Sequence, residues 1–373
     1  MVVHYFLKWI NTARVAERAA AATALSLAYV NRELAFEDHC AAEAALTLLL
    51  DDPSQKVRLA LAEALSMSSK APPQIVGALA SDQPEVAALV LGRSPLFADS
   101  DLIDRVATGP AILQAVIAGR PRLRMGVAAA IAEVGAAEAC LALLENTGAE
   151  IASLSFRRMA ERHGDLPQIR EALVADPRLP PDCRHMLVVK LSEALQRSPL
   201  VIALMGSARA ERVTRDACVR ASLALIESTR SDEHPALVEH LRLGGELTPG
   251  FLVRMVAHGK IDFFGSVLVA LTGQTEPRVT ALLAGGRDVA LTALFRSAGL
   301  PVTAQRALVE ALTVWRAVAN GKRVAGTQEV SWLMMKALGD AAADDDLARL
   351  LKGIHLEALR DNARQHALAI AAA

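Results

Sequence analysis

The stretch Asp51–Pro95, DDPSQKVRLALAEALSMSSKAPPQIVGALASDQPEVAALVLGRSP, decides the fold of this 373-residue chain. It contains a short helical unit, DDPSQKVRLALAEAL, and restates it as SDQPEVAALVLGRSP after an apolar segment of helix length. The aspartates that open the two units, Asp52 and Asp82, are 30 residues apart, the length of two short helices with their turns. Because such periods are typical of helical solenoids, the stretch predicts stacked helix pairs.

The same phase continues further along the chain. Asn146 lies 64 residues after Asp82, which is two units of 32, and Asp176 follows 30 residues later. Prolines fall between the apolar segments, where they can open a helix but not continue one, so the helices are about three turns long. Residues 5–30 form an amphipathic segment that we expect to be a helix capping the end of the stack.

The turns change in character near residue 230, from Asp-Pro pairs to Gly-Gly pairs. We therefore expect N-terminal helical repeats with their capping helix over 1–230. A second helical segment over 231–320 continues the solenoid or packs on it, and a C-terminal helical extension covers 321–373. The polar joint between the first two of these segments is Ser228–Pro235.

Composition supports an all-α protein without a strong overall charge. The chain is 53% hydrophobic and only 3% aromatic, and its apolar residues are mostly Ala, Leu and Val, which suit packed helices. A net charge of −1 provides no global attraction to nucleic acid or to an anionic membrane. Charged residues interrupt the first apolar segment before it could form a signal or membrane-spanning segment, so we expect a cytoplasmic protein with no membrane partner. The cysteines are dispersed and form no CxxC pair, so they suggest neither a zinc site nor a disulfide framework: Cys40, Cys140, Cys183 and Cys218.

The unit DDPSQKVRLALAEAL resembles a HEAT-like repeat. In such repeats an Asp and an Arg six positions apart form a ladder along the solenoid, and Asp52 and Arg58 have this spacing. The next unit departs from it, since Ala88 lies six residues after Asp82, so the resemblance does not imply a continuous ladder.

Longer motifs are similar to an uncharacterised alphaproteobacterial HEAT-like repeat family, domain of unknown function 2336. The motifs are KVRLALAEAL, APPQIVGALASDQPEVAALVLGRSPLFADSDLID, AVIAGRP, LTPGFLVRMVAHGKIDFFGSVLVALTG and RSAGLP. The similarity spans residues 5–318, and no motif is recognised after Gly321. It implies an all-α, HEAT/armadillo-like α-solenoid and brings no activity, cofactor or catalytic residue.

No catalytic motif is present in the sequence. It lacks GxxxxGK[ST], GxSxG, HExxH and the kinase signatures, so we expect a protein that is not an enzyme and needs no cofactor. Cys183 and His185 come closest to a metal-ligand spacing, but neighbouring positions on a helix point in different directions, which favours a packing role. A surface role is likewise favoured over metal binding for the run Asp344–Asp346, which we interpret as a helix cap.

His234, Glu239 and His240, near the joint, suggest an acid–base pair. Because no nucleophile is linked to them by spacing, we interpret them as a solvated helix face.

Arginines are the candidate binding residues. They form three clusters, which would make a cationic stripe for phosphates or an acidic partner helix if they shared one surface: Arg120, Arg122 and Arg124; Arg157, Arg158 and Arg162; Arg209, Arg212 and Arg215. Alternatively, the arginines form ordinary surface ion pairs with acidic residues that lie close in the sequence: Glu161, Asp165, Glu211 and Asp216.

Three functions follow in order of preference. The first is a non-catalytic helical-repeat scaffold that binds a partner protein through a curved surface. The alternative is nucleic-acid or phosphate-ligand binding through the clustered arginines, which the scarcity of aromatic residues disfavours. The third is a small-molecule enzyme or sensor that uses a groove near Ser228–Pro235. The sequence identifies neither the partner nor the oligomeric state.

Overall fold

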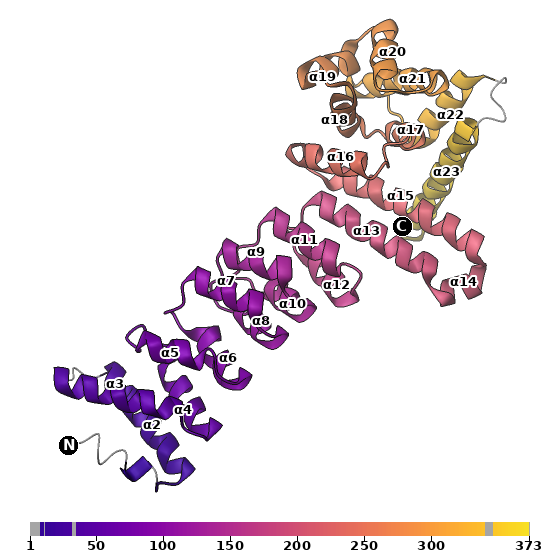
Figure 1. The fold of residues 1–373 in the computed structure, drawn as a ribbon. Helices are drawn as coiled ribbons and strands as arrows, with labels where there is room; N and C mark the ends of the chain where they lie inside the picture. The colour runs from indigo at the N-terminus through magenta and orange to yellow at the C-terminus, as the bar shows by residue number, and fades with distance from the viewer. Residues whose placement is uncertain (1–7, 11, 32–34, 340–345, 373) are drawn as a thin grey trace. The chain divides into compact units, whose positions relative to one another are not determined.

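The computed structural model of the chain describes residues 8–10, 12–31, 35–339 and 346–372. Within these ranges the chain folds into α-helices, with one isolated β-bridge between Leu123 and Ala149 (Figure 1). The fold is therefore all-α, as predicted. The chain divides into two compact units, Met1–Leu179 and Pro180–Ala373.

The first unit is a two-layer stack of short helices. Helices α4, α6, α8, α10 and α12 pack one after another in one layer, α7, α9 and α11 do so in the other, and consecutive helices join the layers. The helices are α2 Val15–Asn31, α3 Phe36–Leu50, α4 Gln55–Leu65, α5 Pro73–Leu79, α6 Pro84–Arg93, α7 Asp99–Thr108, α8 Ala111–Ala118, α9 Met125–Val134, α10 Ala137–Glu145, α11 Ser153–His163 and α12 Pro167–Ala175.

The first helix of the stack begins later than the sequence predicts. α2 starts at Val15, because residues 12 and 13 form a turn on the carbonyl of Trp9, and residues 5–7 lie outside the described ranges. The backbone N–H of Arg14 donates to Glu17 at 2.9 Å, which caps the new start. α2 packs against α3 and α4.

The four polar residues that mark the predicted repeat all lie in the same kind of turn. Each accepts a backbone N–H from one or two positions further on: Asp52 from Ser54 at 2.9 Å, Asp82 from Gln83 at 2.6 Å, Asn146 from Gly148 at 2.9 Å and Asp176 from Arg178 at 2.8 Å. Short polar side chains are favoured here because they satisfy backbone donors that precede a helix.

An arginine–aspartate ladder of two rungs joins the first units. Arg18 contacts both carboxylate oxygens of Asp52, at 2.7 and 3.0 Å, and Arg58 does the same with Asp82, at 2.6 and 3.0 Å. Each rung therefore links an arginine to the aspartate of the following unit. Arg58 meets Asp52, its expected partner, through the backbone carbonyl at 2.6 Å. The series stops at Asp82, since Ala88 offers no guanidinium.

The second unit is built around helix α17, which is enclosed over its last seven residues. All seven residues from Phe251 to Ala257 are buried, and α17 packs on α18, α21, α22 and α23 (Figure 1). The helices are α13 Pro181–Arg197, α14 Pro199–Met205, α15 Ser207–Ser228, the 3-10 turn η1 Ser231–Glu233, α16 His234–Leu243, α17 Pro249–Ala257, α18 Ile261–Thr272, α19 Glu276–Gly285, α20 Asp288–Ser297, α21 Val302–Ala319, α22 Thr327–Leu338 and α23 Asp346–Ala372.

Both expected boundaries, at residues 230 and 320, lie inside this second unit. Leu223 and Ile226 of α15 are buried in the same core as Leu237 of α16, so the polar joint is a surface turn within one body. Met334 and Leu351, from the expected C-terminal extension, belong to that core too. The observed division at 179/180 instead falls just before Pro181, where the long helix α13 opens.

Glycines with a left-handed backbone follow several helices of the second unit, among them Gly245, Gly259, Gly273 and Gly299. Gly259 ends α17 with a φ of +76°, a conformation that residues with a Cβ rarely adopt. A Cβ at Gly259 would also lie 3.1 Å from the ring of Trp315. That ring is held in place because its Nε1 donates to the carbonyl of Val256 at 2.8 Å.

Candidate functional site

The predicted arginines fall into several structural roles. In the first unit Arg120 donates to the carbonyls of Leu91 and Ser94, at the end of α6, and Arg162 donates to those of Ala132 and Gly135, at the end of α9. The last carbonyls of a helix have no intrahelical partner and carry the negative end of its dipole. These two guanidinium groups therefore stabilise helix ends of the preceding repeats.

The other first-unit arginines are closer to solvent. Arg158 contacts Glu133 at 2.8 Å and Glu161 at 3.4 Å, which matches the surface pairing considered from the sequence. Arg124 lies 3.6 Å from Asp99, Arg122 is exposed, and Arg157 is half-buried. Asp165, one of the acids proposed to neutralise this cluster, contributes its backbone carbonyl to Arg170.

The three second-unit arginines lie on α15, in a hairpin formed by α13, α14 and α15 (Figure 1). Arg209, Arg212 and Arg215 are exposed, and Arg215 pairs with Glu211. Ser192 of α13 donates to the carbonyl of Thr214 at 3.3 Å, which sets the register of the hairpin. The arginines consequently line the part of α15 that leads away from α14.

Exposed apolar side chains cover the same end of the hairpin. None of the seven residues of α14, PLVIALM, is buried. Leu200 is 68% exposed and Leu204 is 74% exposed, and further partly exposed apolar residues continue onto the two long helices: Leu191, Leu195 and Val213. We call the apolar residues 191, 195, 200, 202, 204 and 213 the hairpin tip. The sequence shows α14 only as an apolar helix, which ordinarily indicates burial.

Histidines from two helices meet elsewhere in the second unit. His185 Nδ1, on α13, lies 3.2 Å from His240 Nε2, on α16, and His185 Nε2 lies 2.9 Å from Ser222 Oγ and 3.4 Å from Glu246. We call His185, His240 and Glu246 the histidine cluster. Their ligand atoms all lie within 4.8 Å of one another.

Burial shapes the electrostatics of this cluster. His185 is 1% exposed, and its desolvation, together with the nearby His240, lowers its pKa to about 4. Burial raises the pKa of Glu246, and burial together with Glu246 raises that of the Cys218 thiol. At neutral pH the His185 ring is therefore uncharged.

The residues grouped by sequence separate in the structure. Cys183, next to His185 in the proposed metal spacing, is buried and does not belong to the cluster. His234 contacts Ser266 at 3.2 Å and Glu239 pairs with Arg242 at 2.7 Å, so neither lies with His240. Six residues along one helix turn a side chain to another face, which explains the separation. Of the acidic run, Asp346 opens α23, and 344–345 lie outside the described ranges.

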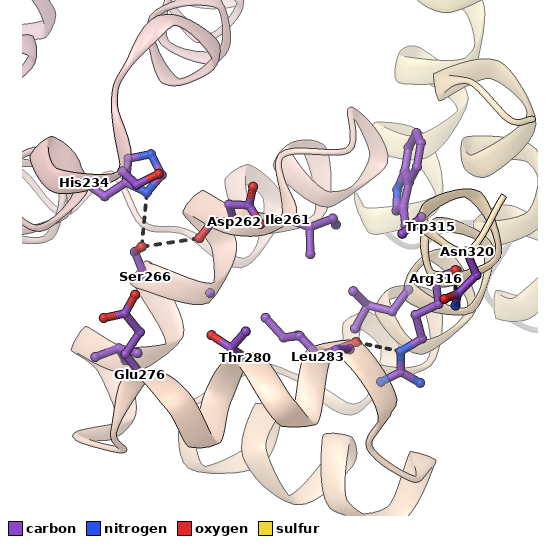
Figure 2. A pocket seen from close by; sticks show the side chains of 16 residues that line it. His234, Ile261, Asp262, Ser266, Glu276, Thr280, Leu283, Trp315, Arg316 and Asn320 are labelled. Atoms are coloured by element: carbon purple, nitrogen blue, oxygen red, sulfur yellow. Dashed lines mark hydrogen bonds between the residues drawn. The ribbon is translucent and has the colours of Figure 1, made fainter.

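A cavity of about 510 Å³ opens beside the predicted joint, between α18, α19 and α21 (Figure 2). Ser231 and His234 line it, with carboxylates from Asp262 and Glu276 and the ring of Trp315. Arg316, also in the lining, is engaged with three carbonyls at the end of α19. The cavity has the size of small-molecule sites. Ser266 Oγ lies 3.2 Å from His234 Nδ1 and 3.3 Å from the carbonyl of Asp262, to which it can donate.

A model of the bacterial family described as "Uncharacterised protein conserved in bacteria (DUF2336)" matches residues 86–348. The chain belongs to the DUF2336 family. The match starts within α6 and ends within α23, later at both ends than the similarity we describe from the sequence. It includes residues 322–348 of the segment after Gly321 that carried no recognised motif. The hairpin, the histidine cluster and the cavity all lie inside the DUF2336 match.

No curated protein and no solved structure matches the chain. Over the parts of the chain that the structure describes, no helix has both the length and the apolar character needed to cross a membrane.

Proposed function

We propose that this protein is a non-catalytic helical-repeat scaffold that binds a partner protein, and that its α13–α15 hairpin docks an amphipathic partner helix with acidic flanks. The observation that carries this proposal is the hairpin tip, where a wholly apolar helix has no buried residue. Large apolar side chains gathered on a surface are typical of sites that another molecule covers. Helix-in-groove recognition uses such side chains as anchors.

The hairpin has the right shape for docking. α14 packs against α13 and α15, and Figure 1 shows it at the opposite end of the hairpin from α16. Leu200 and Leu204 are four residues apart, so they lie on the same face of the helix. Covering each of them would contribute about 1.5 kcal/mol or more to binding, which makes them suitable anchors.

Charge favours an acidic partner. Residues 190–216 contain five basic side chains, Lys190, Arg197, Arg209, Arg212 and Arg215, and three acidic ones, Glu193, Glu211 and Asp216. Arg197 and Arg215 each pair with an acid of their own helix, at exposed positions where such pairs are weak and can be exchanged. An acidic partner would approach this surface faster and in a defined orientation.

Nucleic-acid or phosphate binding is the alternative. Two of the six candidate arginines in the first unit, Arg120 and Arg162, are engaged with helix ends, which reduces the donors available for phosphates. Residues 190–216 contain no aromatic side chain on which a base could stack. Exposed leucines also add nothing to phosphate contacts. These features favour a protein partner. We also propose a cytoplasmic location, because Cys40, Cys140, Cys183 and Cys218 lie within the described residues and form no disulfide there, and a reducing compartment suits such thiols.

The test is photo-crosslinking in a bacterium that carries this protein, with the crosslinking residue at position 204 or, as a control, at the equally exposed position 289. We expect one protein to crosslink at 204 and not at 289. The purified partner should then bind the double variant Leu200→Ser/Leu204→Ser at least about tenfold more weakly than wild type, while Leu243→Ser/Val289→Ser binds normally.

Two results would contradict the proposal. One is equal crosslinking at both positions, and the other is wild-type affinity of the partner for the Leu200→Ser/Leu204→Ser variant. Titration with duplex and single-stranded oligonucleotides tests the alternative, since nucleic-acid binding would weaken steeply with added salt. Circular dichroism of each variant establishes that it is folded.

A further inference from the structure

The histidine cluster has a defined protonation pattern. Ser222 Oγ donates to the carbonyl of Cys218 at 2.9 Å, so its hydrogen is already used. His185 Nε2 lies 2.9 Å from the same oxygen, so we assign the ring hydrogen to Nε2, with the oxygen as its acceptor. The other nitrogen of this neutral ring, Nδ1, presents a lone pair toward His240 Nε2.

We propose that His185, His240 and Glu246 bind a divalent transition-metal ion of the Zn²⁺ type, through His185 Nδ1, His240 Nε2 and a carboxylate oxygen of Glu246. The site would have three protein ligands and an open fourth position. It is separate from the hairpin tip and does not depend on the partner-binding role.

The distances suit such an ion. Zn–N bonds of about 2.0–2.1 Å in a tetrahedral site place two ligand nitrogens about 3.3 Å apart. His185 Nδ1 and His240 Nε2 are 3.2 Å apart. The Glu246 carboxylate lies 3.4 Å from His185 Nε2, and one ligand atom from each of the three residues lies within 4.8 Å of the others. The Glu246 side chain is one-third exposed, which leaves it room to turn toward the Nδ1 side of the ring and complete the set.

The surroundings also suit a metal ligand. A histidine bound to a metal usually donates its other ring N–H to a fixed acceptor, and Ser222 supplies that acceptor to His185. Partial burial disfavours the charged form of a carboxylate that has no positive partner, and a cation between the rings would provide one for Glu246. Two imidazoles and one carboxylate select Zn²⁺, Co²⁺, Ni²⁺ or Cu²⁺ over Mg²⁺ and Ca²⁺.

The test is calorimetric titration of the full-length, EDTA-treated protein with ZnCl₂, followed by Co²⁺ absorption spectroscopy. We expect one Zn²⁺ per chain with a dissociation constant below about 1 µM, and Co²⁺ with the intense visible absorption of a four-coordinate site. His240→Ala, which removes a half-exposed ligand, should weaken Zn²⁺ binding about 100-fold, and Glu246→Gln about tenfold. The control is His366→Ala, at an exposed position of α23, which should leave Zn²⁺ binding unchanged.

Absence of a one-to-one Zn²⁺ site in the wild-type protein would overturn the proposal, as would wild-type affinity in His240→Ala. In either case the two histidines form only a hydrogen-bonded pair. Circular dichroism of His240→Ala and Glu246→Gln shows that loss of Zn²⁺ binding is not loss of folding. His185 is left intact in all variants because its burial makes a substitution there destabilising.

Discussion

Arg58 donates hydrogen bonds to both carboxylate oxygens of Asp82 and a third to the backbone carbonyl of Asp52. One side chain thus joins the turns of two successive units, and both members of the pair are about one-seventh exposed. Burial alone would raise the pKa of Asp82, but the hydrogen bond and charge of Arg58 hold it below its ordinary value. This rung holds the helix pairs in register.

Removing one partner of this rung should destabilise the first unit. In Arg58→Ala the Asp82 carboxylate would remain partly buried without its guanidinium, and we expect a loss of about 2 kcal/mol. Urea unfolding followed by circular dichroism measures it. Arg242→Ala, which breaks the exposed pair with Glu239, should change stability by less than about 0.5 kcal/mol. Equal effects of the two substitutions would show that the rung has no special role.

At position 146 the recurring turn should require an amide, not a carboxylate, for full stability. Asn146 Nδ2 donates to the carbonyls of Ala118 and Arg120, both at 2.7 Å. Asn146→Asp would place a carboxylate against two carbonyl oxygens, and we expect a loss of about 2 kcal/mol in unfolding free energy. The matched control is Asp176→Asn, where an arginine is the neighbour and the loss should be smaller. Wild-type stability of Asn146→Asp would contradict this assignment.

The arginines of the hairpin should affect the rate of partner binding. Arg209→Glu/Arg212→Glu reverses two exposed charges beside the hairpin tip and should lower the association rate constant about tenfold at low salt. Stopped-flow or surface-plasmon measurements with the crosslinked partner would record it. The difference from wild type should shrink as salt is added. An unchanged association rate would indicate a partner surface without acidic groups.

Acid should destabilise the second unit through His185. Its folded-state pKa is about 4 against an ordinary value of 6.5, so the unfolded chain takes up the proton first. Stability is therefore fully present above pH 6.5 and falls as the pH drops toward 4, by about 3 kcal/mol in total. His240 and Glu246 are titratable groups that contact the ring.

An NMR titration of the His185 ring in the metal-free protein measures this pKa directly. A midpoint near 6.5 would contradict the expectation. Unfolding curves between pH 7.5 and 4.5 should show the matching loss of stability.

Gly259 should tolerate substitution less well than Gly299. Both have positive φ, +76° and +77°, but only Gly259 lies against the Trp315 ring. We expect Gly299→Ala to lower the unfolding free energy by about 1 kcal/mol and Gly259→Ala by about 1 kcal/mol more. The extra loss arises because the Trp315 ring must move away from its hydrogen bond with the Val256 carbonyl. Thermal unfolding of the two variants compares them. Equal losses would mean that the ring moves freely.

The helix-pair period could be predicted because its turn is local. Asp52, Asp82, Asn146 and Asp176 each act on a backbone group one or two residues away, so their spacing is visible in the sequence. The boundary could not be predicted, because a polar surface turn such as 228–235 has the same composition as an interdomain linker. Only the burial of Leu223 and Leu237 in one core distinguishes the two cases.

The candidate sites could not be predicted, because they are formed by contacts between segments that are distant in the sequence. His185 and His240 are 55 residues apart, and their meeting is determined by how α13 packs on α16. From the sequence we considered His185 with Cys183, and His240 with His234 and Glu239, and favoured a packing role and a solvated helix face; the meeting of His185 with His240 is visible only in the structure. For the arginines, sequence could not show whether a guanidinium reaches a helix end, as in Arg162, or solvent, as in Arg209.

Arg254 lies on the enclosed helix α17 and pairs at 3.0 Å with Glu357, which comes 103 residues later. The ladder pairs of the first unit are separated by only 24 and 34 residues. During synthesis the first unit can therefore assemble pair by pair as it leaves the ribosome. The core of the second unit stays incomplete until residue 357 has emerged, so its order of assembly is non-local and correspondingly slower.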